Sequence, residues 1–223
     1  MLKKIILAPQ SYKGSIHAFE AAEAMRRGVL KADSQLETVL VPVADGGDGT
    51  LEALVSTTGG EIYKSVVTGP LGQAVEANWG VMGDGNTAVI EMALASGLAL
   101  IPHNRRDPRR ATTRGTGEII KEALDKGFKN IVVGLGGSAT NDAGVGMVAA
   151  LGIKFLDADG QILPPGGQAL SGLASIDISK AHPGLSCANI IGATDVTNTL
   201  CGDRGLPRYL DLRKELPQGW LNN

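Results

Sequence analysis

The sequence predicts an α/β protein with a largely parallel sheet, and three observations support this fold class. Short apolar segments alternate with segments of helical periodicity, both before residue 60 and again after residue 116. Several of the apolar segments run directly into polar loops rich in glycine, as strand-to-helix connections do. Only 4% of the 223 residues are aromatic although 43% are hydrophobic, so aliphatic residues and alanine must supply the core.

The N-terminal elements follow the strand–loop–helix alternation. We expect strands over Lys3–Leu7 and Thr38–Val43 and helices over His17–Ala32 and Thr50–Ser56. Ser15 is placed to act as the N-cap of the first helix, because a hydroxyl there can accept a hydrogen bond from a free amide of the first turn. This repetition indicates parallel strands joined by helices.

The middle of the chain has a different pattern. Three strand-like segments follow one another with turns and no helix between them, which predicts an antiparallel or mixed insertion that begins a second domain. These segments are Ile62–Val67, Val75–Val81 and Thr87–Glu91. The alternation then returns, with helices expected over Gly117–Lys126 and Ala143–Leu151 and strands over Ile131–Gly134 and Ile190–Ala193.

Composition excludes several classes of protein. The net charge is −2 with both signs mixed along the chain, so neither a nucleic-acid partner nor a membrane surface is expected. The apolar run before Pro9 is too short for a signal peptide. Cys187 and Cys201 have no metal-ligand spacing and are expected to be free thiols of a reducing compartment. We therefore expect a cytoplasmic protein, whose oligomeric state the sequence does not indicate.

The glycine-rich stretch Gly134–Gly144 is the strongest functional signal. An apolar strand enters it and a helix follows, so its backbone could approach an anionic group and offer helix N-terminal amides to it. It is not a Walker A loop, because no Lys-Ser/Thr pair follows its last glycine. Gly134, Gly136 and Ala139 match the dinucleotide-binding fingerprint only loosely, which leaves an NAD-binding oxidoreductase as a minor alternative.

Three further loops carry polar groups, each with a simpler alternative. Asp45 and Asp48 could hold Mg²⁺ or accept a proton, or they could merely cap the following helix. Lys13 could neutralise a phosphate, or it could be a solvated charge. Arg114 could bind a carboxylate or phosphate, whereas Thr116 beside it could simply cap a helix. Together these loops favour phosphoryl transfer, which depends on positioning and charge neutralisation.

The motifs as a set resemble those of the bacterial glycerate kinases, in the order that the family has them, over residues 1 to about 205. The matching segments are Leu7–Ser15, Ala44–Thr50, Gly69–Gly72, Glu91–Ala93, Ser96–Leu98, Gly134–Gly144 and 195–198. The resemblance implies ATP-dependent, Mg²⁺-dependent phosphorylation of a hydroxyl of D-glycerate. It also implies two α/β domains with the active site in the cleft between them.

The resemblance also suggests roles for particular residues. Lys13 would neutralise charge, one of Asp48 and Asp195 would be the base for the glycerate hydroxyl, and Asp45 would bind the metal. The residues that it suggests for binding substrate or phosphate are Ser11, Gly136, Gly137, Ser138, Thr140, Asn141 and Asp142. Arg114 is expected to join them because of the charge and hydroxyls of its own loop.

The chain departs from the family in two respects. Gln10 stands where the family usually has Asp, which removes a carboxylate from the expected site. Family members are also considerably longer, and Leu206–Asn223 can be explained as an out-of-frame tail after loss of one nucleotide near Gly205. The expected division is then 1–63, an incomplete first domain whose C-terminal part is missing, 64–205, the second domain, and 206–223, the tail. An inactive fragment, or an anion-binding module without catalysis, is the alternative to a kinase.

Overall fold

The larger part of the chain is built on a five-stranded mixed sheet. The computed structural model describes residues 4–12 and 15–197. The strands are β3 (Glu61–Thr68), β4 (Ala74–Val81), β5 (Thr87–Glu91), β6 (Asn130–Gly134) and β9 (Asn189–Ala193), in the order β3-β4-β5-β6-β9. The pairs β3–β4 and β4–β5 are antiparallel, whereas β5–β6 and β6–β9 are parallel. The expected antiparallel start of this region is therefore confirmed.

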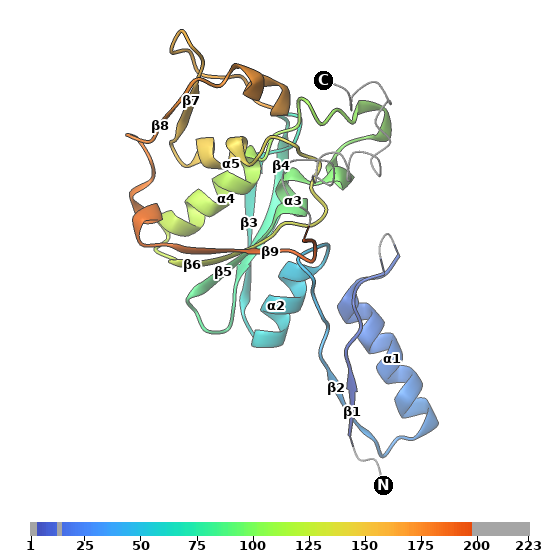
Figure 1. Cartoon of the computed structure of the whole chain (residues 1–223). Coiled ribbons are helices and arrows are strands. Elements are labelled where there is room, and N and C mark those ends of the chain that lie inside the picture. Colours follow the sequence, from blue (N-terminus) through green and yellow to red (C-terminus); the bar gives the residue numbers. More distant parts are fainter. Residues whose placement is uncertain (1–3, 13–14, 198–223) are drawn as a thin grey trace.

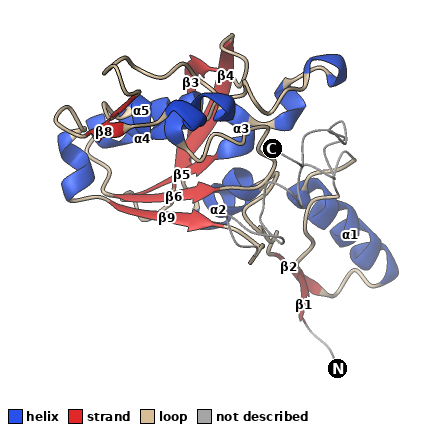
Figure 2. Cartoon of the chain, turned by 45° about the horizontal axis from the view of Figure 1, so that its top comes forward, coloured by secondary structure: helices blue, strands red, loops and turns tan. Residues whose placement is uncertain are grey.

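Helices cover both faces of this sheet. The helices α3 (Met92–Ser96), α4 (Arg114–Asp125) and α5 (Val145–Ala150) lie on one side and α2 (Thr50–Thr58) on the other (Figures 1 and 2). Neighbouring residues of a strand point to opposite faces. Ile90 accordingly packs with Ile119 of α4, whereas Val89 packs with Leu51 and Val55 of α2. All five side chains are almost fully buried, so β5 is covered on both sides.

The N-terminal segment forms a separate two-stranded parallel sheet. Strands β1 (Lys4–Leu7) and β2 (Glu37–Leu40) are joined by α1 (Ala18–Ala32), and the three elements lie beyond α2 from the large sheet (Figure 1). Helix α1 buries only alanines, whereas Ile6 of β1 is 64% exposed. This sheet therefore has much less apolar cover than the large one.

Smaller elements lie between β6 and β9, and the sequence did not predict them. The strands β7 (Lys154–Leu156) and β8 (Ser175–Asp177) form an antiparallel pair. The 3₁₀ turns η3 (Gly167–Gly172) and η4 (Pro183–Ser186) also lie there, whereas η1 (Leu98–Leu100) and η2 (His103–Arg105) lie between α3 and α4. Within the described residues, no helix is both long and apolar enough to cross a membrane.

The expected fold class is confirmed, with local corrections. Strand β2 ends at Leu40 rather than Val43, and helix α4 begins at Arg114 rather than Gly117. Helix α1 begins at Ala18 with His17 as its N-cap, so the predicted cap at Ser15 is wrong. Ser15 instead donates its backbone N–H to the Tyr12 carbonyl in a tight turn.

The division into two domains stays a prediction. Helix α2, expected in the first domain, packs its buried side chains on the large sheet. The proposed tail 206–223 lies outside the described residues.

Candidate functional site

Three polar loops meet where neighbouring strands end. Glu91, Gly134 and Ala193 pair across β5, β6 and β9, so they form one row at the carboxyl ends of these parallel strands. This is the edge at which open α/β sheets bind ligands. The loop after β2 reaches the same row, because the Gly136 N–H donates to the Gly46 carbonyl at 2.8 Å. Loops distant in sequence are thus brought together here.

The loops approach so closely that side chains are excluded at two glycines. A Cβ on Gly46 would lie 2.4 Å from the Ala193 carbonyl oxygen, and Gly46 also has a φ of +92°. A Cβ on Gly136 would lie 2.5 Å from the Gly47 Cα. Both distances are far below van der Waals contact, so only glycine fits. The glycines therefore pack one loop against another, a role that the sequence alone did not separate from ligand binding.

Asp48, Ser11 and Gly137 come together in this cluster. The Ser11 hydroxyl donates to the Asp48 carbonyl at 2.9 Å. A Cβ on Gly137 would lie 2.8 Å from Asp48 Oδ1, which places the Asp48 carboxylate directly beside the glycine-rich loop. Asp48 is exposed, so its carboxylate is accessible from solvent. Two expected binding residues and one expected catalytic residue are thus neighbours.

Asp45 lies in the same loop and contacts the residue that departs from the family. Its Oδ1 accepts the Gly47 N–H at 2.9 Å, and its Oδ2 accepts a hydrogen bond from the Gln10 side-chain amide. An amide here neutralises no charge, but it occupies a carboxylate oxygen that a metal could otherwise use. Among the described residues, no three His, Cys, Asp or Glu side chains form a metal-binding group.

The remaining expected catalytic residues are less well defined by their contacts. Asp195 is exposed and follows Ala193 by two residues, and the Ala193 carbonyl accepts the Leu135 N–H at 3.0 Å. Asp195 therefore lies just beyond the end of β9, next to the row of strand ends. Lys13 lies outside the described residues.

Glu91 is a residue of this site to which the sequence assigned no role. Its side chain is 3% exposed, and its two oxygens accept the N–H groups of Gly49 at 3.2 Å and Leu51 at 3.0 Å. Burial raises the pKa of the Glu91 carboxyl above its ordinary value. The two N–H donors and His17 oppose the rise in pKa, and the charge of Asp48 adds to it. The sequence signals were a lone carboxylate that ends an otherwise apolar strand and the family-like segment Glu91–Ala93, which assigned this residue no role.

The second half of the glycine-rich loop is held by its own hydroxyls. Ser138 Oγ and Thr140 Oγ1 are 2.9 Å apart, and the Thr140 N–H donates to Ser138 Oγ at 3.0 Å. The Ala139 N–H donates to the Ser96 carbonyl at 2.9 Å, which ties the loop to the end of α3. Asn141 follows and is exposed. These residues form a compact turn beside the Asp48 cluster.

Asp142 is buried, with 1% exposure, and bonds to the protein itself. Its Oδ2 accepts the Thr113 N–H and hydroxyl, each at 2.9 Å, and the Gly146 N–H at 3.0 Å. Its Oδ1 accepts the Gly144 N–H at 3.2 Å. We expected the amides at the start of the helix after the glycine-rich loop to point outward without partners. Those of Gly144 and Gly146 instead bind Asp142. A role for Asp142 in ligand binding stays a prediction.

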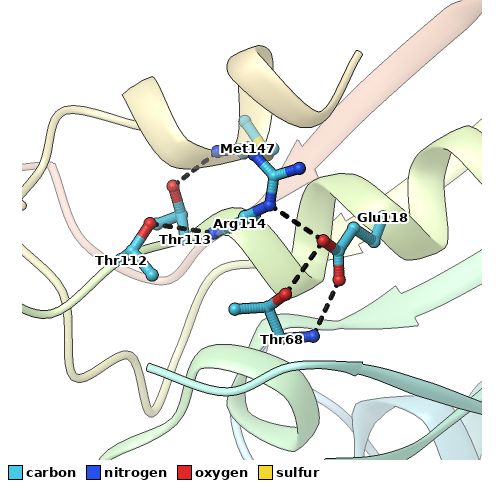
Figure 3. A network of polar contacts seen from close by, with 6 residues as sticks. All are labelled: Thr68, Thr112, Thr113, Arg114, Glu118 and Met147. Carbon is cyan, nitrogen blue, oxygen red and sulfur yellow. Dashed lines mark hydrogen bonds and ion pairs between the residues drawn. The ribbon is translucent and has the colours of Figure 1, made fainter. Parts of the chain in front are cut away.

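Arg114 is directed along the first turn of α4. Its Nε donates to Glu118 Oε1 at 3.0 Å, and Glu118 in turn accepts the Thr68 N–H at 2.7 Å and hydroxyl at 2.9 Å (Figure 3). Thr113 is the N-cap of α4, so the alternative that Thr116 caps this helix is wrong. Thr116 is instead buried, with its hydroxyl 2.9 Å from that of Ser96.

The fold and the strand-end loops define an α/β protein with a polar site at the edge of a parallel sheet, and comparison with known proteins specifies it further. A sequence profile described as the glycerate kinase family matches residues 5–209. The chain therefore belongs to the glycerate kinase family.

The relatives carry the same description and are longer. The chain is 51% identical over 211 residues to the glycerate 2-kinase of Escherichia coli K12, covering 95% of this chain and 55% of that protein. It is 53% identical over 202 residues to the glycerate kinase of Bacillus subtilis 168, covering 91% and 53%. A crystal structure described as a candidate glycerate kinase 2 from Salmonella typhimurium LT2 superposes with a TM-score of 0.87 at 46% identity, covering 98% and 59%. The chain thus spans about half the length of these relatives.

Proposed function

We propose that this chain supplies part of the active site of a glycerate kinase, which transfers a phosphoryl group from ATP, with Mg²⁺, to a hydroxyl of D-glycerate. The observation that carries the proposal is the cluster of Ser11, Asp48 and Gly137 at the strand ends of a chain from this family. The relatives named glycerate kinase or glycerate 2-kinase support the substrate. The expected cytoplasmic location belongs to the same proposal.

Asp48 and Asp195 are the candidates for the base that accepts the proton of the attacking hydroxyl. Both are exposed carboxylates, so a substrate hydroxyl could approach either of them from solvent. Lys13 would neutralise the charge of the transferred phosphoryl group. Asp45 would hold Mg²⁺. One or two protein carboxylates are enough for this ion, because it commonly takes its remaining ligands from water and substrate phosphates. When bound, the ion would neutralise charge on the phosphates.

The glycine-rich loop would hold the phosphate or the carboxylate of glycerate. Gly136, Gly137 and Ser138 are the expected contacts, and Gly137 lies directly beside the Asp48 carboxylate. Thr140, Asn141, Asp142 and Arg114 would complete the wall of the site farther along the loop and α4.

Binding without catalysis is the second candidate function. Two observations favour it: the chain spans about half the length of its relatives, and the small N-terminal sheet exposes apolar side chains. An incomplete site of this kind could still bind an anion without transferring a phosphoryl group.

A coupled assay of ADP release with D-glycerate distinguishes the two. Turnover supports the kinase, and Asp48→Asn and Asp195→Asn should then lower kcat about a hundredfold for whichever residue is the base, with little change in thermal unfolding. Calorimetric binding of ATP or glycerate without ADP release would favour the binding module. Wild-type kcat in either variant removes that residue from the mechanism.

A further inference from the structure

We propose that Glu91 is a positioning residue, whose buried carboxylate holds the loop 45–49 in the conformation that places Asp48 beside the glycine-rich loop. The catalytic consequence of this inference rests on the proposed function. Its structural claim, that Glu91 fixes the loop, does not.

Glu91 acts as the cap of a helix from which it is distant in sequence. Helix α2 begins at Thr50 after Gly49, which has a φ of +90° and provides no side chain to cap the first turn. The N–H groups of Gly49 and Leu51 would therefore lack acceptors within the helix. Glu91 supplies one oxygen to each of them from the end of β5. Its negative charge also lies at the positive end of the helix dipole.

This arrangement leaves the aspartates of the loop free for another role. The sequence left open whether Asp45 and Asp48 merely cap the helix. Asp45 instead accepts the N–H of Gly47 within its own loop, and two amides of the helix start go to Glu91. Asp48 consequently remains exposed next to Gly137. A buried carboxylate performs the capping, and an exposed one faces the site.

Glu91 also links the two loops that form the cluster. Its backbone pairs in register with Gly134, where the glycine-rich loop begins. Its side chain holds the start of α2, which directly follows Asp48 in sequence. A single residue on a central strand therefore sets the spacing between the Asp48 loop and the glycine-rich loop. Because β5 is buried on both faces, this anchor has little freedom to move.

The first test measures the loop without reference to catalysis. In Glu91→Gln, an amide N–H₂ group replaces one of the two carboxylate oxygens, so one backbone N–H loses its acceptor and faces another donor. Hydrogen exchange at Gly49 and Leu51 should therefore become about tenfold faster or more. The matched control is Glu122→Gln, which removes the charge of a carboxylate that accepts the Ser65 hydroxyl at 2.5 Å, far from this loop. Equal protection of residues 45–51 in wild type and Glu91→Gln would overturn the proposal.

A second measurement does not need Glu91→Gln and covers the case in which that variant does not fold. The amide proton shifts of Gly49 and Leu51 in the wild-type protein should follow one common titration as Glu91 takes up a proton. Asp48 and His17 are the other charged groups that act on Glu91, so Asp48→Asn and His17→Gln identify any contribution from them. Amide shifts that do not change together with pH would contradict the assignment.

Kinetics then test the positioning role. If the wild-type chain turns over D-glycerate, Glu91→Gln should lower kcat at least about tenfold while the KM for ATP changes less than about twofold, and Glu122→Gln should change neither. A loosened loop with unchanged kcat would refute positioning. If the wild-type chain shows no turnover, the proposed function fails, and the exchange and titration results still decide whether Glu91 fixes the loop.

Discussion

The two sheets of this chain differ in how completely they are covered. In the large sheet, Ala88, Val89 and Ile90 of β5 are fully buried between α2 and α4. In the small sheet, Ile6 is 64% exposed, and each strand has a single neighbour. Parallel sheets are normally covered on both faces. The difference shows that the large sheet is packed by helices of this chain, whereas the described chain leaves the small one partly uncovered.

The same contrast recurs at the edge of the large sheet. Strand β9 is the last in the order, and Ile190 and Ile191 are 41% and 51% exposed. The relatives have nearly as much chain again beyond the part that matches. Exposed apolar side chains therefore lie on β1 and on β9, two strands whose following loops contribute Ser11 and Asp195 to the site.

Matched isoleucine substitutions give the largest expected difference between the two sheets. Ile90→Ala should lower the free energy of unfolding by about 2–5 kcal/mol, because a fully buried side chain leaves a cavity. Ile6→Ala should change it by about 0.5 kcal/mol or less. Urea unfolding of both variants measures this. Similar losses would mean that Ile6 is covered in solution.

A matched pair of aspartates should show the next largest effect. Asp142→Asn places N–H₂ donors against the donors of Thr113, Gly144 and Gly146, so we expect a loss of about 3 kcal/mol. Asp48→Asn should cost about 0.5 kcal/mol or less, because its carboxylate is exposed. Equal losses in chemical unfolding would contradict the distinction between a structural and an accessible carboxylate.

Ala143 offers a smaller test within the loops of the large sheet. It is the one non-glycine residue with positive φ in the described part of the chain, at 51°. Ala143→Gly should relieve this strain, and glycine should also lose more conformational entropy on folding, which opposes the gain. The net effect should be a rise of up to about 1 kcal/mol in the free energy of unfolding. Ala149→Gly, inside α5, should instead be destabilising by about 0.5–1 kcal/mol. A destabilised Ala143→Gly would show that the loop relaxes without strain.

The smallest effect concerns pH and the residue that links the two regions. Burial raises the pKa of Glu91, so ionisation of its carboxyl disfavours the folded state. Ionisation of Glu91 therefore leaves the free energy of unfolding unchanged below the ordinary pKa of glutamate. It lowers the free energy of unfolding as pH rises from that ordinary pKa through the raised pKa of the folded state. The stability of wild type relative to Glu91→Gln should fall over that interval. A flat difference across a pH series would exclude this ionisation.

The sequence predicted much of the fold because its periodic segments are unambiguous. Thr87–Glu91 was predicted with the bounds that β5 has, and the other four strands of the large sheet each begin one residue before their predicted start. The short pair β7–β8 was missed, since three-residue strands carry almost no periodic signal. The cap of α1 was misplaced because Ser15 instead closes a turn with Tyr12.

The candidate site was predicted less fully. The glycine spacing indicated close approach, but only the structure shows that Gly46 and Gly136 meet other backbone segments rather than a ligand. The hydrogen bonds from Thr113 to Asp142 and from Gly49 to Glu91 span 29 and 42 residues, which no local pattern contains. The bonds of Asp142 with Gly144 and Gly146 are local. Buried carboxylates in apolar surroundings are a signal that could have identified Glu91.

The alternation of side chains along β5 has a consequence for engineering. Val89 and Glu91 face α2, and Ile90 between them faces α4. A slip of one residue in the pairing of β5 would exchange these faces, placing a carboxylate in the core under α4 and an isoleucine at the start of α2. An insertion or deletion in this strand would therefore alter packing and loop geometry together. Redesign of the site should accordingly be confined to substitutions that preserve this strand's length.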